Sequence, residues 1–282
     1  MAIKTGLVLE GGAMRGMFTC GVTDVFMENG IRFDGAAGIS AGAVFGCNIK
    51  SGQPRRAIRY NMKYGRDPRY CSIRSLITTG DMYGAEFCYH TLPDELDPFD
   101  REAFRNDPME FYVGATDVNS GRAVFHLCSD GGERDIQWMR ASASMPLASN
   151  IVKIDGRELL DGGIVCAVPY RFMEKRGYNR NVIILTQPEG YEKKKSALMP
   201  LIKATQSRYP KLVEAMSVRH EMYNRQMQEI AELEENGTLV IRPPASLGIS
   251  RTESDPKELR RVYLLGRKEG QRRLEEVKEY LG

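Results

Sequence analysis

The chain has 282 residues, a hydrophobic content of 42%, a charged content of 27% and a formal net charge of +3. These values are typical of a folded globular protein, and the near balance of charges predicts no nucleic-acid partner. The sequence contains no apolar run of the roughly 18 residues that a membrane-spanning helix requires.

The six cysteines are scattered, without a C-x-x-C pair or a neighbouring histidine cluster. This usage predicts free thiols in a reducing compartment and argues against a structural metal. The first apolar run ends at Leu9, which is too short for the core of a secretory signal peptide. We therefore expect a cytoplasmic protein that uses no metal and no cofactor.

The first fifty residues alternate short apolar runs with helical patterns. Residues 5–10 ("TGLVLE") and 31–38 ("IRFDGAAG") predict buried strands. Residues 14–30 and 40–52 predict helices, each closed by a glycine. Strand, helix, strand and helix in this order predict an α/β domain with a mostly parallel sheet.

The next stretch, residues 55–74, is basic, carries tyrosines and is opposed within itself only by Asp67. One interpretation is a solvated helix face. The other is attraction to an anionic lipid surface, where each nearby basic residue contributes up to about 1 kcal/mol. Because the sequence shows no span or lipid anchor, we expect any such membrane contact to be transient.

Residues 110–128 and 150–163 predict two hairpins. The second has the pair Asp155-Gly156 where a two-residue primed turn requires it. Residues 131–144 predict a helix, and residues 181–186 predict another buried strand.

After about residue 188 the strand patterns nearly vanish. Residues 211–235 and 255–280 predict long charged helices, and an edge strand is expected between them. We therefore predict a strand-containing domain over residues 1–188. A helical C-terminal region over residues 189–282 would be packed on this domain or appended to it.

The sharpest local motif is "GISAG", residues 38–42, which has the G-x-S-x-G form of a nucleophile elbow. In such an elbow, Gly38 and Gly42 allow a tight strand-to-helix turn that exposes the hydroxyl of Ser40. The alternative is that Ser40 caps the following helix, since serine is a common N-cap residue.

A serine nucleophile needs a base. The three histidines, His90, His126 and His220, lie in segments that favour packing or surface roles, although His220 is placed late enough in the chain for a histidine triad. Asp161 is the other candidate, because "DGG" at residues 161–163 ends a predicted strand. An Asp-Gly turn without a catalytic role is the alternative for this motif.

The glycine-rich corner "LEGGAMRG" after the first strand could supply hydrogen-bond donors for an oxyanion. The amides of Gly11, Gly12 and Ala13 are candidates, and Arg15 adds positive charge near a helix N-terminus. A nucleotide phosphate loop is the competing interpretation. It lacks both the Lys-Ser/Thr pair and the G-x-G-x-x-G spacing that such loops carry.

Together these motifs resemble the patatin-like phospholipase family of serine acyl hydrolases. The family pattern [D/E]-G-G-G-x-R-G, G-x-S-x-G and D-G-[G/A] is similar to residues 10–16, 38–42 and 161–163, and "RASASMP" at 140–146 resembles the block before the family aspartate. The resemblance covers residues 6–187. The glycines at matching positions are Gly11, Gly12, Gly16, Gly38, Gly42, Gly162 and Gly163.

This resemblance implies a three-layer α/β fold and a dyad in which Ser40 is the nucleophile and Asp161 the base. It implies hydrolysis of a phospholipid or lysophospholipid ester through an acyl-enzyme. An aspartate base should then be partly desolvated, because its ordinary pKa of about 3.9 makes it weak. Ala13 stands where the family has a third glycine, and alanine is expected to favour negative φ there.

Two rivals to the dyad hydrolase remain open from the sequence. One is a histidine-dependent esterase that uses His220. The other is a non-catalytic protein of the same fold that binds a lipid or a protein partner.

Overall fold

The computed structural model describes residues 3–282 and contains one eight-stranded sheet. Its strand order is β5-β6-β3-β2-β1-β7-β8, and β4 pairs with β3 beside this path. The strands are β1 (Thr5–Leu9), β2 (Gly35–Ile39), β3 (Glu110–Asp117), β4 (Arg122–Cys128), β5 (Val152–Ile154), β6 (Arg157–Asp161), β7 (Arg180–Ile184) and β8 (Leu239–Ile241). Strands β3, β2, β1, β7 and β8 run parallel, whereas β4, β5 and β6 join as antiparallel neighbours.

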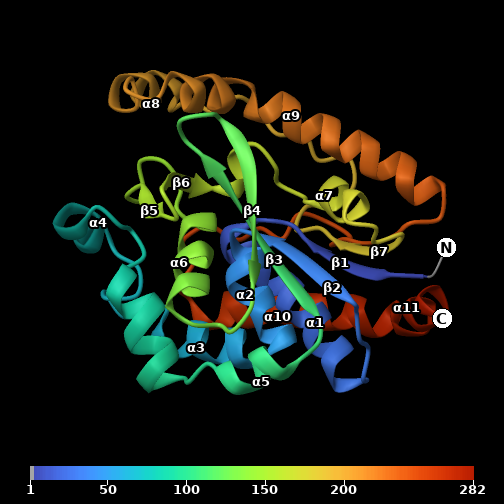
Figure 1. The fold of residues 1–282 in the computed structure, drawn as a ribbon. Helices are drawn as coiled ribbons and strands as arrows, with labels where there is room; N and C mark the ends of the chain where they lie inside the picture. Colours follow the sequence, from blue (N-terminus) through green and yellow to red (C-terminus); the bar gives the residue numbers. More distant parts are fainter. Residues whose placement is uncertain (1–2) are drawn as a thin grey trace.

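Helices cover both faces of the sheet, as a parallel sheet of apolar strands requires (Figure 1). Leu7 and Leu9 of β1 pack in one core with Phe18 and Val262. Val8 points to the other face and joins a second core with Ile230. The helices of the first face include α1 (Gly16–Glu28), α2 (Ala41–Lys50) and α10 (Pro256–Arg272), and those of the second include α7 (Tyr170–Lys175) and α9 (Pro210–Glu235).

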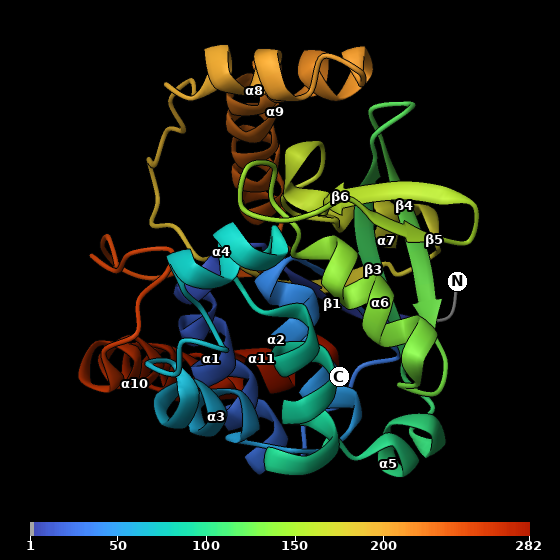
Figure 2. The ribbon, with the colours of Figure 1, turned by 90° about the vertical axis from the view of Figure 1, so that its left-hand side faces the viewer.

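The remaining helices are spread around the molecule (Figures 1 and 2). They are α3 (Arg56–Tyr64), α4 (Ile73–Thr79), a π-helix (Phe87–Leu96), α5 (Arg101–Asn106), α6 (Glu133–Ser142), α8 (Met199–Thr205) and α11 (Leu274–Leu281). Helix α11 lies beside β7, and α4 lies on the opposite side of the molecule. Two single 3-10 turns follow strands: Ala13–Arg15 comes shortly after β1, and Gly162–Ile164 follows β6 directly. The expected α/β fold with a mostly parallel central sheet and a helical C-terminal region is confirmed.

Both predicted hairpins form, and Asp155 and Gly156 have φ values of 51° and 70°, as a type I′ turn requires. The helix predicted over 255–280 is instead two helices, α10 and α11, that meet at Arg273. The guanidinium of Arg273 donates to the carbonyl oxygen of Val240 in β8, 3.2 Å away. This contact ties the junction of the two helices to the edge of the sheet.

The residues after 188 add to the same sheet and core as the residues before. Strand β8 pairs with β7, and α10 lies directly against α1. A Cβ atom on Gly21 would come within 2.1 Å of the Tyr263 carbonyl oxygen, and one on Gly266 within 2.0 Å of the Phe18 carbonyl oxygen. Glycine therefore allows the two helix backbones to touch. The division into domains at residue 188 stays a prediction.

Candidate active site

Ser40 lies at the sharp junction between β2 and α2. Its φ and ψ of 54° and −119° are unusual for a residue with a side chain, as expected for a nucleophile elbow. A Cβ atom on Gly38 would lie 2.3 Å from the Gly42 carbonyl oxygen, and one on Gly42 would lie 2.5 Å from the Leu9 carbonyl oxygen. Both glycines are therefore needed for the chain to turn here. Ser40 occupies the N-cap position of α2, but its hydroxyl donates to Asp161 instead of capping the helix.

The register of the sheet brings Asp161 to Ser40. Ile39 pairs with Gly114 of β3, and the next residue of β3, Ala115, pairs with Asp161 at the end of β6. The two side chains therefore emerge on either side of β3, and the Ser40 hydroxyl donates to Asp161 Oδ2 at 2.7 Å. The sequence-predicted pair is brought together across 121 positions of chain.

The Asp161 carboxyl is buried behind Ser40, with 2% of the residue exposed. Its Oδ1 accepts a hydrogen bond of 2.7 Å from the amide of Gly163, so the second glycine of the "DGG" motif orients the carboxylate. Burial raises the pKa of Asp161 above its ordinary value, whereas the positive charge of Arg219 and the hydrogen bonds from Ser40 and Gly163 oppose the rise. Desolvation thus makes this carboxylate a stronger base than an exposed aspartate.

Ser142 holds the backbone at the nucleophile, a role that the sequence did not reveal. Its hydroxyl donates to the Gly114 carbonyl oxygen at 2.6 Å and accepts from the Ser40 amide at 2.8 Å. The hydroxyl therefore links β3 to the turn that carries Ser40. The available signal was the small-residue block "RASASMP", in which Ser142 is the first serine.

The glycine-rich corner packs against the nucleophile turn. The Gly11 amide, a predicted oxyanion donor, already donates to the Ala167 carbonyl oxygen at 3.2 Å. Gly11 is instead required for space, because a Cβ atom there would lie 3.0 Å from the Ile39 oxygen and 3.1 Å from the Ser40 Cβ. Among residues 3–282, the amides of Gly12 and Ala13 have no acceptor, and these two remain as candidate donors. At the corner's other end, a Cβ on Gly16 would lie 2.9 Å from the Ala41 Cβ.

Ala13 adopts a φ of 49°, contrary to the expectation that alanine restricts this position to negative φ. The close packing of the corner imposes the glycine-like backbone on alanine, at a cost of about 1 kcal/mol. Replacing Ala13 with glycine is therefore expected to raise the free energy of unfolding by about 0.5 kcal/mol, after the flexibility of glycine in the unfolded chain is subtracted.

Urea denaturation measures this effect. The reverse change, Gly30→Ala, serves as the matched control, because Gly30 has a φ of 69° with no atom within 4 Å of an added Cβ. It should lose about 0.5 kcal/mol, because the same two contributions act with opposite sign. An Ala13→Gly variant that loses stability would show that the methyl group contributes packing that outweighs the backbone strain.

Arg15 follows the corner with its side chain partly buried. Its Nε atom is buried and has no hydrogen-bond partner within the described part of the chain, residues 3–282. An unpaired buried donor of this kind is uncommon in proteins. The role of Arg15 at an oxyanion site stays a prediction.

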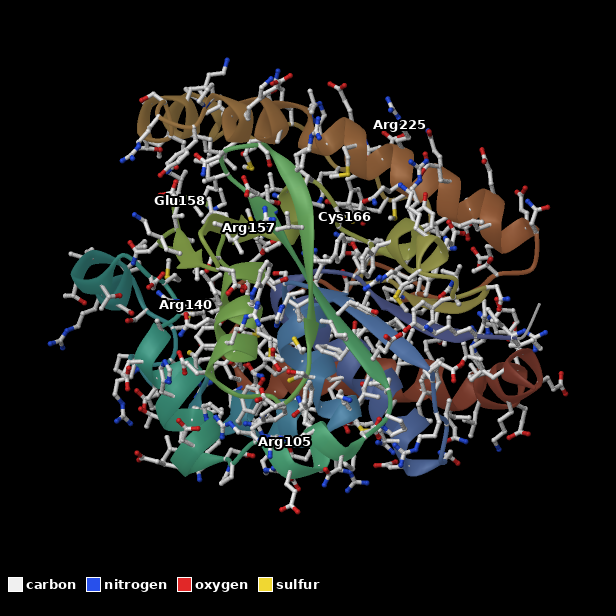
Figure 3. All side chains as sticks on the ribbon, in the orientation of Figure 1. Arg105, Arg140, Arg157, Glu158, Cys166 and Arg225 are labelled. Carbon is white, nitrogen blue, oxygen red and sulfur yellow. The ribbon has the colours of Figure 1, made fainter. Side chains whose placement is uncertain are left out.

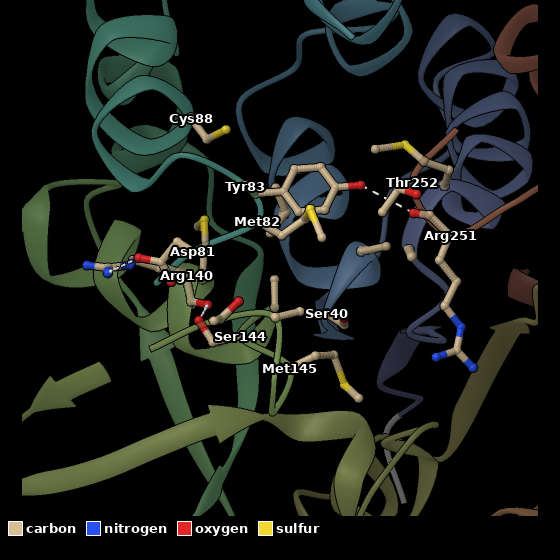
Figure 4. A pocket seen from close by; sticks show the side chains of 18 of the residues that line it. Ser40, Asp81, Met82, Tyr83, Cys88, Arg140, Ser144, Met145, Arg251 and Thr252 are labelled. Carbon is tan, nitrogen blue, oxygen red and sulfur yellow. Dashed lines mark hydrogen bonds and ion pairs between the residues drawn. The ribbon is translucent and has the colours of Figure 1, made fainter. Parts of the chain in front are cut away.

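Ser40 opens into a cavity of about 500 Å³. Most of the wall is apolar and comes from α2, the π-helix and α6, including Val44, Phe45, Leu92, Ile136 and Met139. The nucleophile-bearing turn and Ala13 lie at the wall, and Figure 4 shows Ser40 between the Asp81–Arg140 ion pair on one side and Arg251 on the other. A cavity of this size and polarity suits a ligand with a long apolar part.

The contacts of His126 and His220 are with groups other than the Ser40 hydroxyl. His126 bonds to Asp135 at 2.7 Å and stacks on Trp138. His220 lines the cavity, but its ring nitrogen lies 3.6 Å from Glu221. The structure gives the Ser40 hydroxyl a carboxylate partner and not an imidazole partner.

His126, Cys128 and Asp135 have potential ligand atoms within 4.8 Å of one another. The Asp135 carboxylate already accepts from His126 and from the amides of Ser129, Asp130 and Gly131. These hydrogen bonds fasten the loop before α6 to Asp135 in the first turn of that helix, and they already occupy the carboxylate oxygens of the cluster.

The basic stretch 55–74 is largely neutralised by ion pairs, most of them with acids that are distant in sequence. Its arginines pair with Glu28, Asp97, Asp67 and Asp255 in the ion pairs Arg55–Glu28, Arg56–Asp97, Arg59–Asp97, Arg66–Asp255 and Arg69–Asp67. The predicted attraction to an anionic surface depended on the positive charge of this stretch. These ion pairs offset most of that charge. Among residues 3–282, no helix is both long and apolar enough to cross a bilayer.

The chain thus has an α/β fold in which a partly buried serine at a strand-to-helix turn donates a hydrogen bond to a buried carboxylate. The sequence profile of the patatin-like phospholipase family matches residues 7–173, and the chain belongs to this family. A second profile, DUF6363, described as a domain of unknown function, matches residues 209–282.

The proteins to which this chain is similar match different lengths of it. It is 27% identical to the uncharacterized protein YjjU of Escherichia coli K12, over 94% of this chain and 75% of that protein. It is 30% identical to lysophospholipase nte1 of Aspergillus niger over 57% of this chain, which spans about a tenth (10%) of that protein. The NTE family protein Rv1063c of Mycobacterium tuberculosis is 26% identical over 67% of this chain and 50% of its own length.

Among solved structures, VipD from Legionella pneumophila aligns with a TM-score of 0.47 and 14% identity, over 97% of this chain and 67% of that one. Family membership and the lysophospholipase relatives support lipid hydrolase activity.

Proposed function

We propose that the chain is a serine acyl hydrolase that cleaves carboxylic esters of lipids, with Ser40 as the nucleophile and Asp161 as the general base. The observation that carries this proposal is the 2.7 Å hydrogen bond from the Ser40 hydroxyl to the buried Asp161 carboxylate, at the wall of an apolar cavity. A nucleophile bonded to a base that is itself held by a third group, the Gly163 amide, is the arrangement that acyl transfer requires.

In the proposed reaction, the Ser40 oxygen forms a bond to the ester carbonyl carbon while its proton passes to Asp161. The amides of Gly12 and Ala13, with the charge of Arg15, stabilise the negative oxygen that develops. The alcohol then leaves with the proton from Asp161, and an acyl ester on Ser40 remains. Asp161 next takes a proton from a water molecule, and the water oxygen forms a bond to the acyl carbon. The bond between this carbon and the Ser40 oxygen then breaks, the fatty acid leaves, and Ser40 regains its proton from Asp161.

The size of the cavity and the lysophospholipase relatives support a substrate with one acyl chain. A volume of about 500 Å³ lies within the range of sites that enclose most of a single small ligand. A monoacyl lipid would place its chain along the apolar wall and its ester at Ser40. The six free cysteines also support the proposal of a reducing, cytoplasmic location.

A substrate screen tests the proposed function. Purified protein would be assayed on acyl esters of graded chain length and on lysophospholipids, beside Ser40→Ala and His220→Ala. We expect wild-type turnover, loss of turnover in Ser40→Ala and turnover within about threefold of wild type in His220→Ala. Loss of turnover in the folded His220→Ala protein would favour the histidine-dependent esterase, and absence of wild-type turnover on every ester would favour a binding protein.

We further propose that the protein meets its substrate by transient contact with a lipid surface, through apolar side chains beside the cavity. Ile73 and Ile77 of α4 are 69% and 78% exposed, and Leu198 and Leu201 at α8 are 56% and 50% exposed. Leu198 also lines the cavity. Figures 1 and 2 show α4 and α8 on the same side of the molecule.

Replacing Ile73 and Ile77 with serine is expected to weaken binding to lipid vesicles by about tenfold, because partial burial of two isoleucines contributes at least about 1.4 kcal/mol. Co-sedimentation with vesicles measures this, and hydrolysis of a soluble short-chain ester should stay unchanged. Leu264→Ser, at a side chain on α10 that is 45% exposed, is the matched control. Equal vesicle binding by both variants would contradict the assignment of this surface.

A further inference from the structure

Four cations from outside the region that matches the patatin-like family line the cavity of the proposed nucleophile: Lys193, Lys194, Arg219 and Arg251. Lys193 lies before α8, Arg219 lies on α9 and Arg251 lies before α10, and all three line the same cavity as Ser40. Arg15 of the glycine-rich corner is within electrostatic range of Lys193 and Arg219. We refer to Lys193, Arg219 and Arg251 as the basic triad.

The basic triad carries an excess of positive charge. Within the described residues, 3–282, none of its members forms an ion pair, in contrast to Arg140 at the other side of the cavity, which pairs with Asp81 at 3.1 Å. The carboxylates in electrostatic range of the triad are Asp161 and Glu10. Lys194 also lines this cavity, so the cations around it outnumber these two carboxylates.

Both of these carboxylates are already satisfied by other groups. Asp161 accepts from Ser40 and Gly163. Glu10 is buried and accepts from the amide and hydroxyl of Thr186 and from the hydroxyl of Tyr223. The positive charge of the basic triad is therefore available to an anion that enters the cavity.

The triad is held in place by contacts that leave its charged atoms available. The amide of Lys193 donates to the Asn224 side chain at 2.8 Å, and the Lys193 ammonium lies 3.8 Å from the centre of the Tyr223 ring. Arg219 Nε donates to the Gly163 carbonyl oxygen at 2.7 Å, and among residues 3–282 its two terminal nitrogens make no hydrogen bond. The Tyr83 hydroxyl donates to the backbone of Arg251 at 3.2 Å, which fixes this segment over the cavity (Figure 4).

The charges of the triad also repel one another. Burial and the nearby charge of Arg219 lower the pKa of Lys193 to about 7, and burial lowers the pKa of Arg219. An anion bound among these groups would remove this repulsion. Guanidinium groups present paired N–H donors that match the oxygens of a phosphate group.

We propose that Lys193, Arg219 and Arg251 form a subsite for the phosphate group of the substrate. The preferred substrate is then a monoacyl glycerophosphate with an anionic headgroup, whose chain lies along the apolar wall while its phosphate meets the triad. This inference rests on the proposed function for the position of the ester, and it adds a headgroup site built by the C-terminal region.

The first test compares two substrates with the same acyl chain, a 1-acyl glycerol 3-phosphate and a neutral monoacylglycerol, both below their micelle concentrations. Wild-type protein is expected to prefer the phosphate substrate by at least about a hundredfold in kcat/KM. Lys193→Gln and Arg251→Gln should each reduce this preference by about tenfold, the loss expected for one charge-assisted hydrogen bond. A ratio of two substrates cancels general damage to the enzyme.

The matched control is Arg225→Gln. Arg225 lies on α9, six residues after Arg219, and is exposed on the outer side of that helix (Figure 3). It should keep the wild-type preference. A preference that is unchanged in Lys193→Gln and Arg251→Gln, or equally reduced in Arg225→Gln, would overturn the subsite.

The second test measures equilibrium binding to Ser40→Ala, which separates this inference from the proposed function. The phosphate substrate is expected to bind at least about tenfold more tightly than the monoacylglycerol and than inorganic phosphate. Equal binding of the two lipids would overturn the subsite even if the wild type hydrolyses both. Tighter binding of inorganic phosphate than of the lipid would assign the triad to free phosphate and overturn the headgroup assignment.

Discussion

Replacing Asp161 with asparagine is expected to lower kcat on a lipid ester by about a thousandfold, with KM changed by less than about threefold. Asparagine has the same shape and can still accept the bond from Ser40, but it cannot take up the hydroxyl proton. General base catalysis by a positioned side chain contributes about 10²–10⁴-fold. Steady-state kinetics with purified variants measure the effect, and Ser40→Ala sets the background rate.

The pH dependence of kcat/KM provides a second, independent readout of the same residue. Because only the ionised carboxylate accepts a proton, activity should fall as the pH falls through the pKa of Asp161. Burial raises that pKa above 3.8, so the acid limb is expected at a higher pH than for an exposed aspartate. The residual activity of Asp161→Asn should lack this limb. An Asp161→Asn enzyme with near wild-type kcat and the same acid limb would show that another group is the base.

Replacing Gly266 with alanine is expected to lower the free energy of unfolding by about 3 kcal/mol, the upper part of the range for overpacking. The added Cβ would lie 2.0 Å from the carbonyl oxygen of Phe18, a backbone atom that can move only if α1 moves. Helix α1 starts directly after the glycine-rich corner, so this strain would also reach the candidate oxyanion donors. Urea unfolding followed by circular dichroism measures the change.

Lys268→Ala is the matched control, because Lys268 is exposed on the same helix and its replacement should change stability by less than about 0.5 kcal/mol. One cooperative transition at lower urea is the expected form of the Gly266→Ala curve. Two separate transitions would indicate that the residues after 188 unfold on their own and do not share the core. Unchanged stability would show that α10 does not hold its close position against α1.

The motifs that the sequence could reveal are those whose chemistry is local. Gly38 and Gly42 are required because the turn at Ser40 leaves no room for a Cβ. The "DGG" motif orients its own carboxylate through the amide of Gly163. Strands such as β1 and hairpins such as β5–β6 are readable for the same reason, since periodicity and turn residues act over a few positions.

The features that could not be predicted depend on contacts between distant parts of the chain. Ser142 meets the Ser40 amide across 102 positions, and a serine in a small-residue block carries no mark of that partner. The positive φ of Ala13 is imposed by packing, against the preference of alanine itself. Arg219 lies in a helix pattern that indicated only an amphipathic surface, yet it contacts the backbone beside Asp161.

The charge of the basic stretch 55–74 also depends on partners that are distant in sequence. Its arginines appeared unopposed because Glu28, Asp97 and Asp255 lie elsewhere in the sequence. Conversely, the cavity cations Lys193, Arg219 and Arg251 are spread over 59 positions, counted from 193 to 251 inclusive, and no local pattern groups them. Charge read along a sequence therefore does not show which positive charges gain an acidic partner in the fold.

Covalent labelling with a fluorophosphonate tests most directly whether Ser40 is an activated nucleophile. The reagent would be added to folded wild-type protein, Ser40→Ala and Asp161→Asn, and the adduct mapped by mass spectrometry of the digested chain. We expect one adduct per molecule on Ser40, no adduct in Ser40→Ala and much slower labelling in Asp161→Asn. A folded wild-type protein that remains unlabelled at Ser40 while it hydrolyses lipid esters would contradict it.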